Sequence, residues 1–164
     1  MPLFPYDREA VVSYARRWAM SRNPRYSDYD GLGGDCTNFA SQCIYAGSGV
    51  MNYKPTFGWY YAGTNNHSPS WTGVPFLYNF LTRRQGVGPA GEQATMQQVM
   101  PGDISQFAGG KSGFSHTQVV VSAGNILALD NILVCTHTYD SLDRPLSSYD
   151  FSQIRFIHIT GVIK

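Results

Sequence analysis

Charged residues are scarce in this sequence, and the two signs nearly cancel. Only 14% of the residues are Asp, Glu, Lys or Arg, and the formal net charge is +1. A protein whose main partner is a nucleic acid or an anionic membrane normally carries a marked excess of Lys and Arg. The sequence therefore gives no electrostatic basis for either partner.

Long apolar runs and a dense set of cysteines are also missing. No apolar segment approaches the ~20 residues of a membrane-spanning helix, and the N-terminus lacks the basic and apolar regions of a signal peptide. Three cysteines cannot all pair with one another, and they are too few for a disulfide-stabilised scaffold. We therefore expect no membrane span, and either a cytoplasmic protein or a domain excised from a longer secreted chain.

The residues that are present predict one α+β domain over residues 1–164. A hydrophobic content of 43% suits a folded core. Helical periodicity predicts helices from Asp7 to about 21, from 36 to about 46 and from 70 to 84, followed by a flexible connection at 86–91. Runs of Val, Ile, Thr and Phe predict strands at 104–107, 115–122, 132–139 and 154–163. We expect the N-terminal helices to pack on a mainly antiparallel sheet.

One stretch combines a tight turn with the start of a helix. Gly33 and Gly34 permit the left-handed backbone of a sharp turn, and apolar residues then recur at helical spacing from Cys36 to Gly47. This spacing predicts a helix with one buried face and places Cys36 in its first turn. Because a helix N-terminus stabilises a thiolate, Cys36 is the candidate nucleophile. Cys43, two turns later on the same face, is expected in the core.

Two histidines lie near the ends of predicted strands. His116 begins one strand, and His137 lies near the end of the next. If the strands form a hairpin, the residue opposite His116 falls within 137–139, and the Cys36 helix can pack over both histidines. A cysteine nucleophile needs an imidazole as base and a third polar group to orient it. His116 is the predicted base, and either His137 or Asp140 orients it, with His137 preferred.

A zinc site is an alternative for the same region. Cys36, Cys135, His116 and His137 are suitable ligand types. Structural zinc sites usually draw on pairs with C-x₂₋₄-C spacing, whereas only one residue separates Cys135 from His137. We therefore expect no metal and no organic cofactor.

The segment 51–70 lacks clear periodicity and contains the aromatic run Trp59, Tyr60 and Tyr61. A loop of this length inside a compact domain is often functional, and aromatic side chains can stack on a sugar or a peptide. Anchoring of a wrapped loop explains the same aromatic residues equally well. The sequence leaves both roles open.

These motifs together resemble the putative amidase domain family of bacterial proteins. The resemblance covers about Tyr6 to Ile163 and rests on Gly34-Asp35-Cys36-Thr37-Asn38-Phe39-Ala40-Ser41-Gln42, Trp59-Tyr60-Tyr61, Pro101-Gly102-Asp103, Ser115-His116-Thr117 and His137-Thr138. That family looks related to the NlpC/P60 and CHAP cysteine peptidases, which share a papain-like core. NlpC/P60 enzymes typically have Asp-Cys-Ser-Gly where this chain has Asp-Cys-Thr-Asn, so their substrate preference transfers poorly.

The resemblance implies a cysteine amidase or peptidase that uses Cys36, His116 and His137, with bacterial cell-wall peptides as the usual substrate class. It also implies a secreted or cell-envelope location within a larger protein. Asp35, Trp59, Tyr60 and Ser115 are the expected substrate-binding residues, and the protein is expected to be a monomer.

Two other functions fit the same residues. A binding module on this scaffold would keep the groove and its aromatic residues without turnover. An acyltransferase would pass the Cys36 acyl group to an amine instead of water.

Overall fold

The computed structural model describes residues 2–84, 86–110 and 113–164. Within these ranges the helices are α1 (Arg8–Trp18), α2 (Cys36–Ser48), α3 (Pro69–Thr72) and α4 (Val74–Arg83), with two short 3₁₀ helices, η1 (Met96–Gln98) and η2 (Leu146–Ser148). One antiparallel sheet has the order β3-β8-β4-β5-β6-β7. Its strands are β3 (Gly88–Ala94), β4 (Ile104–Ala108), β5 (His116–Ala123), β6 (Ile132–Thr136), β7 (Ser141–Pro145) and β8 (Gln153–Ile163). A small hairpin pairs β1 (Tyr61–Gly63) with β2 (Asn66–His67).

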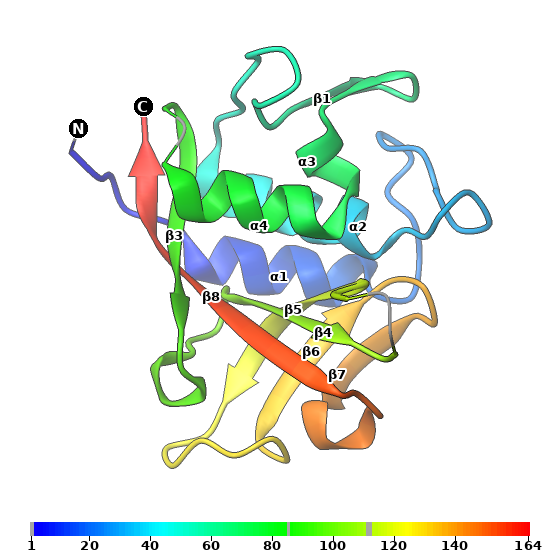
Figure 1. The fold of residues 1–164 in the computed structure, drawn as a ribbon, viewed down its shortest axis with the longest axis vertical. Coiled ribbons are helices and arrows are strands. Elements are labelled where there is room, and N and C mark those ends of the chain that lie inside the picture. The colour runs from blue at the N-terminus through cyan, green and yellow to red at the C-terminus, as the bar shows by residue number, and fades with distance from the viewer. Residues whose placement is uncertain (1, 85, 111–112) are drawn as a thin grey trace.

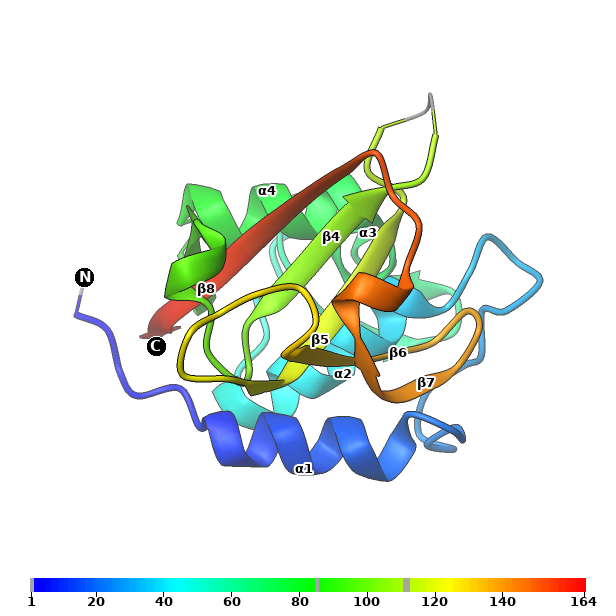
Figure 2. The same ribbon diagram turned by 90° about the horizontal axis from the view of Figure 1, so that it is seen from below.

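The helices cover one face of the six-stranded sheet (Figure 1). Alternate residues of β5 face opposite sides, as the period of a strand requires: Val119 and Val121 join the core under the helices, whereas Val120 joins the core of the other face. That other face is covered by η2 and the loop between β5 and β6, seen in Figure 2. The predicted α+β class, with N-terminal helices packed on an antiparallel sheet, is confirmed.

The first two helices begin where the sequence predicts. The side chain of Asp7 accepts a hydrogen bond from the backbone N–H of Ala10, which satisfies one of the unpaired donors at the start of α1. Helix α2 begins at Cys36 and ends at Ser48, and the next residue, Gly49, has a φ of 70° and forms the left-handed C-cap that glycine favours. The predicted stripe is buried along its length, and Cys43 is in the core.

The third predicted helix is divided in two. Residues 69–72 form α3, and α4 starts at Val74, because Gly73 has an extended backbone with φ −114° and ψ 127°. Pro75 lies in the first turn of α4, where its missing N–H has no partner to lose. One periodic pattern therefore spans a sharp change of direction.

The predicted flexible connection at 86–91 is in large part a strand. Strand β3 pairs with β8 from Gly88↔Ile163 to Ala94↔Phe156, with a bulge between Ala90 and Gly91. A Cβ atom on Gly91 would lie 2.7 Å from the carbonyl oxygen of His158, so the two backbones can approach only because glycine is there. The small residues hide the strand from propensity rules, which favour β-branched and aromatic residues.

Strands β5 and β6 form the predicted hairpin. Val119 lies opposite Cys135, and this register, continued one residue at a time, would set Thr138 opposite His116, within the predicted window. The ladder itself stops earlier, since β6 ends at Thr136.

The predicted strand 132–139 is too long at its end. Thr138 and Tyr139 have positive φ values of 56° and 62°, so the chain turns after β6 and returns as β7, which was not predicted. Positive φ at two successive residues is the geometry of a tight hairpin turn that normally selects Asn and Gly. A strained turn therefore lies at the end of β6.

Replacing Tyr139 by glycine should stabilise the protein by about 1 kcal/mol. The side chain is 88% exposed and loses little packing, and relief of ~1–3 kcal/mol of left-handed strain exceeds the ~0.5–1 kcal/mol entropic cost of glycine. The measurement is the free energy of unfolding in urea. Ile126→Gly is the control, because Ile126 is 85% exposed without a positive φ, and it should destabilise; equal losses in both variants would contradict the strain.

Candidate active site

Cys36 lies at the first residue of α2, beside the start of β5. The side chain is 7% exposed, and its Sγ atom is 3.7 Å from Thr37 Oγ1. Thr37 Oγ1 lies in turn 2.9 Å from Thr117 Oγ1 on β5. Thr117 directly follows His116 in the chain. The predicted nucleophile therefore lies on α2 and the predicted base on β5, where these two elements pack together.

Burial decides the charge of the Cys36 thiol at rest. Burial raises its pKa above the ordinary value, and hydrogen bonds from the Thr117 backbone and from Thr37 offset this in part. The helix start alone predicted a shift in the opposite direction. In this conformation the desolvation of a charged sulfur outweighs the favourable donors, so the resting thiol is protonated at neutral pH.

His116 points away from the thiol. The side chain of Thr117 faces α2, where its Oγ1 lies 2.9 Å from that of Thr37, so His116 faces the other side of the sheet. Its ring packs against the rings of Phe107 and Tyr149, with centroid distances of 5.0 and 6.3 Å. Within the described part of the chain no hydrogen bond joins His116 to Cys36. Burial, followed by the positive charge of Arg144, lowers the pKa of His116 to about 4.

His137 is held by a different set of partners. Its Nδ1 lies 2.5 Å from Asp35 Oδ2, and its Nε2 lies 2.7 Å from the carbonyl oxygen of Trp18. The ring also stacks on Phe39 with a centroid distance of 4.0 Å. Both ring nitrogens therefore face oxygen acceptors, and neither is left to orient His116.

Asp35 connects this histidine to the start of the Cys36 helix. Its carboxylate accepts hydrogen bonds from the backbone N–H of Tyr29 and from Asn38 Nδ2, at 2.9 and 2.8 Å. Although Asp35 is the N-cap residue, its side chain makes no cap hydrogen bond. It is 1% exposed, so the structure gives it internal partners in place of the expected substrate contact.

Asp140, the other candidate for orienting His116, is also occupied. Arg22 donates to both of its carboxylate oxygens, each at 2.9 Å, and the same guanidinium bonds to Asp30. This cluster ties the loop before α2 to the turn after β6. Asp140 thus braces the surroundings of Cys36 without touching His116.

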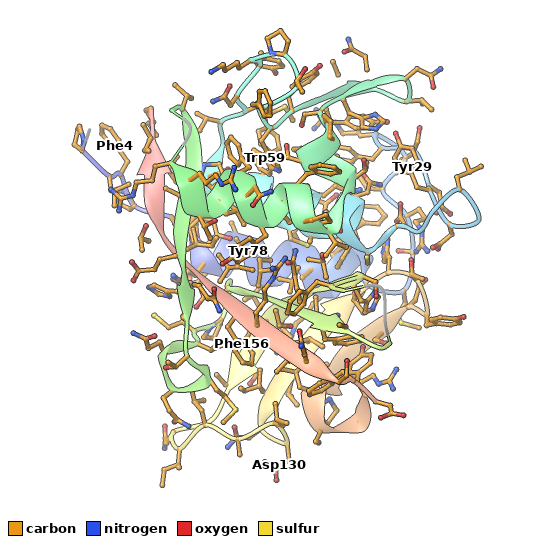
Figure 3. The ribbon with its side chains drawn as sticks, viewed as in Figure 1. Phe4, Tyr29, Trp59, Tyr78, Asp130 and Phe156 are labelled. Atoms are coloured by element: carbon orange, nitrogen blue, oxygen red, sulfur yellow. The ribbon has the colours of Figure 1, made fainter. Side chains whose placement is uncertain are left out.

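The remaining expected substrate-binding residues are dispersed. Trp59 is fully buried and donates to Ser41 Oγ at 3.1 Å; Figure 3 shows it inside the molecule. It is therefore not open to a ligand. Tyr60 is half-buried and packs near Tyr53, and Ser115 is exposed immediately before β5. Of the four residues, Ser115 and Tyr60 are accessible.

A pocket adjoins the turn that leads into α2. Its volume is about 240 Å³, and it is lined by Tyr29, Leu32, Gly33, Gly34, His67 and Thr72. Tyr29 lies at its edge in the loop before α2 (Figure 3), and its hydroxyl is 3.2 Å from His67 Nδ1. The sequence signals for these residues are weak, because a lone histidine is most often structural and loop tyrosines usually only pack. The pocket provides room for a substrate beside the first turn of α2.

The four residues of the alternative zinc site do not converge. Over residues 2–84, 86–110 and 113–164, no group of three or more His, Cys, Asp or Glu side chains could hold a metal ion. The cysteines Cys36, Cys43 and Cys135 are all free thiols.

Among the described residues, no helix has the length and apolar character needed to cross a membrane.

Comparison with known proteins gives a family match over most of the chain. The family described as "Putative amidase domain" matches residues 5–160. The uncharacterized protein YhbB of Bacillus subtilis is 34% identical over 152 residues, which are 90% of this chain and 46% of that protein. The chain thus spans about half the length of this curated relative. No solved structure matches.

Proposed function

Because this chain belongs to the putative amidase domain family, we propose that it hydrolyses amide bonds through a thioacyl intermediate on Cys36. The observation that supports this chemistry is the place of Cys36 at the first residue of α2, where Thr37 Oγ1 lies 3.7 Å from the Cys36 sulfur and 2.9 Å from Thr117 Oγ1. These contacts join the start of a helix, which favours a negative sulfur, to the residue next to a histidine.

In the proposed reaction the neutral His116 accepts the thiol proton, and the sulfur of Cys36 attacks the amide carbonyl carbon. The backbone N–H of Cys36 donates to the developing oxyanion. The carbon–nitrogen bond then breaks, and the protonated imidazole gives its proton to the leaving amine. Water, deprotonated by the same imidazole, attacks the thioester and releases the acid and the free thiol. These reaction steps require the His116 ring to leave its contact with Phe107 and turn toward the sulfur of Cys36.

His137 enters this proposal as a positioning residue. It binds Asp35, the residue before Cys36, and the carbonyl of Trp18 at the end of α1. These contacts fix the first turn of α2 relative to α1.

The proposed substrates are peptides of the bacterial cell wall, and the proposed setting is a domain of a larger secreted or envelope protein. This proposal rests on the match to the putative amidase domain family and on a proposed relation of that family to the NlpC/P60 and CHAP peptidases, with their papain-like core. The test is incubation with purified peptidoglycan and with soluble muropeptides, followed by assay of new amino groups and mass spectrometry of the products. New amines released by the wild type but not by His116→Ala support the proposal. Intact substrates in every case would overturn it.

The pH dependence of activity provides a second prediction. Because the base acts in its neutral form and the pKa of His116 is lowered to about 4, kcat/KM should stay high in mild acid and fall as the pH drops through that value. Arg144→Gln removes a positive charge that disfavours protonation, so the acidic limb should move to higher pH. Arg17→Gln is the control for the change in net charge. A wild-type limb near the ordinary histidine pKa of ~6.5 would contradict the resting position of the ring against Phe107 and Tyr149.

A binding module is the second candidate, favoured by the separation of His116 from the Cys36 thiol. Such a protein would bind the wall without cutting it. Sedimentation of Cys36→Ala with insoluble cell wall separates the two functions. Retention on the wall, combined with no amine release by the wild type, would favour the module.

A further inference from the structure

A line of buried polar side chains connects Arg155 to the sulfur of Cys36. Arg155 Nε and Nη2 donate to Gln106 Oε1 at 2.9 and 2.7 Å. Gln106 Nε2 is 3.2 Å from Thr117 Oγ1, which is 2.9 Å from Thr37 Oγ1. Thr37 Oγ1 is in turn 3.7 Å from Cys36 Sγ. We call these hydrogen bonds the Arg155 relay.

Donor chemistry fixes the direction of the first two steps of the relay. A guanidinium can only donate, so the amide oxygen of Gln106 faces Arg155, and the amide nitrogen donates to Thr117 Oγ1 and to the carbonyl oxygen of Val74. Either hydroxyl can be the donor between Thr117 and Thr37, and either atom can be the donor between Thr37 and the Cys36 sulfur. When Thr117 donates to Thr37 and Thr37 donates to the sulfur, the hydrogen bonds run in one direction from the guanidinium to Cys36.

Burial removes water as a competing partner along this route. Thr37 is 1% exposed, and Gln106 and Thr117 are 0% exposed. Buried polar groups are costly unless they are fully paired, and a valine would fill either threonine site without that cost. Packing alone therefore does not explain why threonine, and not valine, occupies positions 37 and 117.

The charge at the far end is not neutralised by a carboxylate. Arg155 forms no ion pair among the described residues; it lies over the rings of Tyr78 and Phe114, at 3.7 and 4.0 Å from their centroids. Tyr78 extends from α4 toward β8, as Figure 3 shows. The positive charge is therefore free to polarise the hydrogen bonds of the relay.

We propose that the Arg155 relay stabilises the thiolate of Cys36, with Thr37 as the positioning residue that donates to the sulfur. This proposal rests on the proposed role of Cys36 as nucleophile. It adds which side chains stabilise the negative charge of the Cys36 thiolate. A hydrogen bond to an ionised acceptor is about twice as strong as a neutral one, so the relay favours the thiolate more than the thiol. It opposes the burial that raises the thiol pKa.

The test is the rate of Cys36 alkylation by iodoacetamide as a function of pH, read by peptide mass spectrometry. Thr37→Val keeps the side-chain shape and removes the donor, and it should raise the midpoint of the rate profile by roughly 1–2 pH units. Thr37→Ser should restore the wild-type midpoint. The pH-dependent ultraviolet absorbance of the thiolate, taken as the difference from Cys36→Ala, gives the same midpoint where alkylation is slow.

A second pair of variants tests the far end of the relay. Arg155→Met should raise the midpoint more than Arg83→Met, which removes the same charge elsewhere. An unchanged midpoint in Thr37→Val, or equal shifts in the two arginine variants, would overturn the relay. None of these measurements uses an amide substrate, so loss of the relay and loss of the proposed hydrolysis are separate outcomes.

Discussion

Replacement of Cys36 by alanine should lower amide hydrolysis by roughly 10⁴-fold or more, the scale on which nucleophile loss acts in covalent catalysis. Without the sulfur no thioacyl intermediate can form, and Thr37 Oγ1 loses its contact with the Cys36 side chain. The fold should remain, because the substitution removes one atom from a side chain at the edge of the core. The measurements are the rate of amine release and the free energy of unfolding in urea.

Cys135→Ala is the matched control for the loss of a thiol. Cys135 is fully buried on β6 and packs in the core under the helices, so its replacement should reduce stability through a small cavity and leave the activity of folded protein unchanged. Activity that survives in Cys36→Ala would exclude the thioacyl route. Activity lost equally in both variants would indicate a general loss of structure.

Replacement of His137 by alanine should lower the free energy of unfolding by about 3 kcal/mol, the upper end of the range for leaving a buried polar group without its hydrogen-bond partner. The side chains of His137 and Asp35 are each 1% exposed, and the change would leave the Asp35 carboxylate without its closest partner. Arg22, whose Nε is 3.5 Å from the same carboxylate oxygen, can replace only part of that interaction. Urea denaturation followed by circular dichroism measures the loss.

His158 provides a control, because it also contacts an aspartate but is more exposed to solvent than His137. Its Nδ1 is 2.9 Å from Asp103 Oδ2, but the side chain is 24% exposed, and Asp103 also binds Arg8. His158→Ala should therefore cost much less than His137→Ala. If His137→Ala kept its stability and lost only its turnover, the ring would act on the chemistry and not on the position of α2.

The parts of the fold that follow a strong periodic pattern could be predicted from the sequence. Helix α2 has a glycine turn before it, an apolar stripe along it and a glycine cap after it, and each signal points to the same element. Strand β3 could not be predicted, because Gly88, Pro89 and Gly91 are poor strand formers whose pairing depends on the distant strand β8. Tertiary contacts, not local propensity, define that edge of the sheet.

The candidate site divides in the same way. Cys36 could be placed because the start of a helix is a local feature. The direction of His116 could not, because it depends on which residue of β5 packs against α2, and Thr117 takes that place through its contact with Thr37. The pairing of His137 with Asp35 joins residues 102 positions apart, and no motif spacing reports such a contact.

Strand β8 has a consequence for how the protein is made. It lies between β3 and β4 in the sheet, and at its far end Val162 also pairs with Phe4. During synthesis, earlier strands can form hairpins, but β3 and β4 have no common neighbour until residues 153–163 have left the ribosome. Contacts of such long sequence separation slow folding and leave strand edges open in the meantime. The nascent chain therefore depends on β8 to complete the sheet, because without β8 the strand β3 has no partner strand and β4 keeps an open edge that is prone to aggregate.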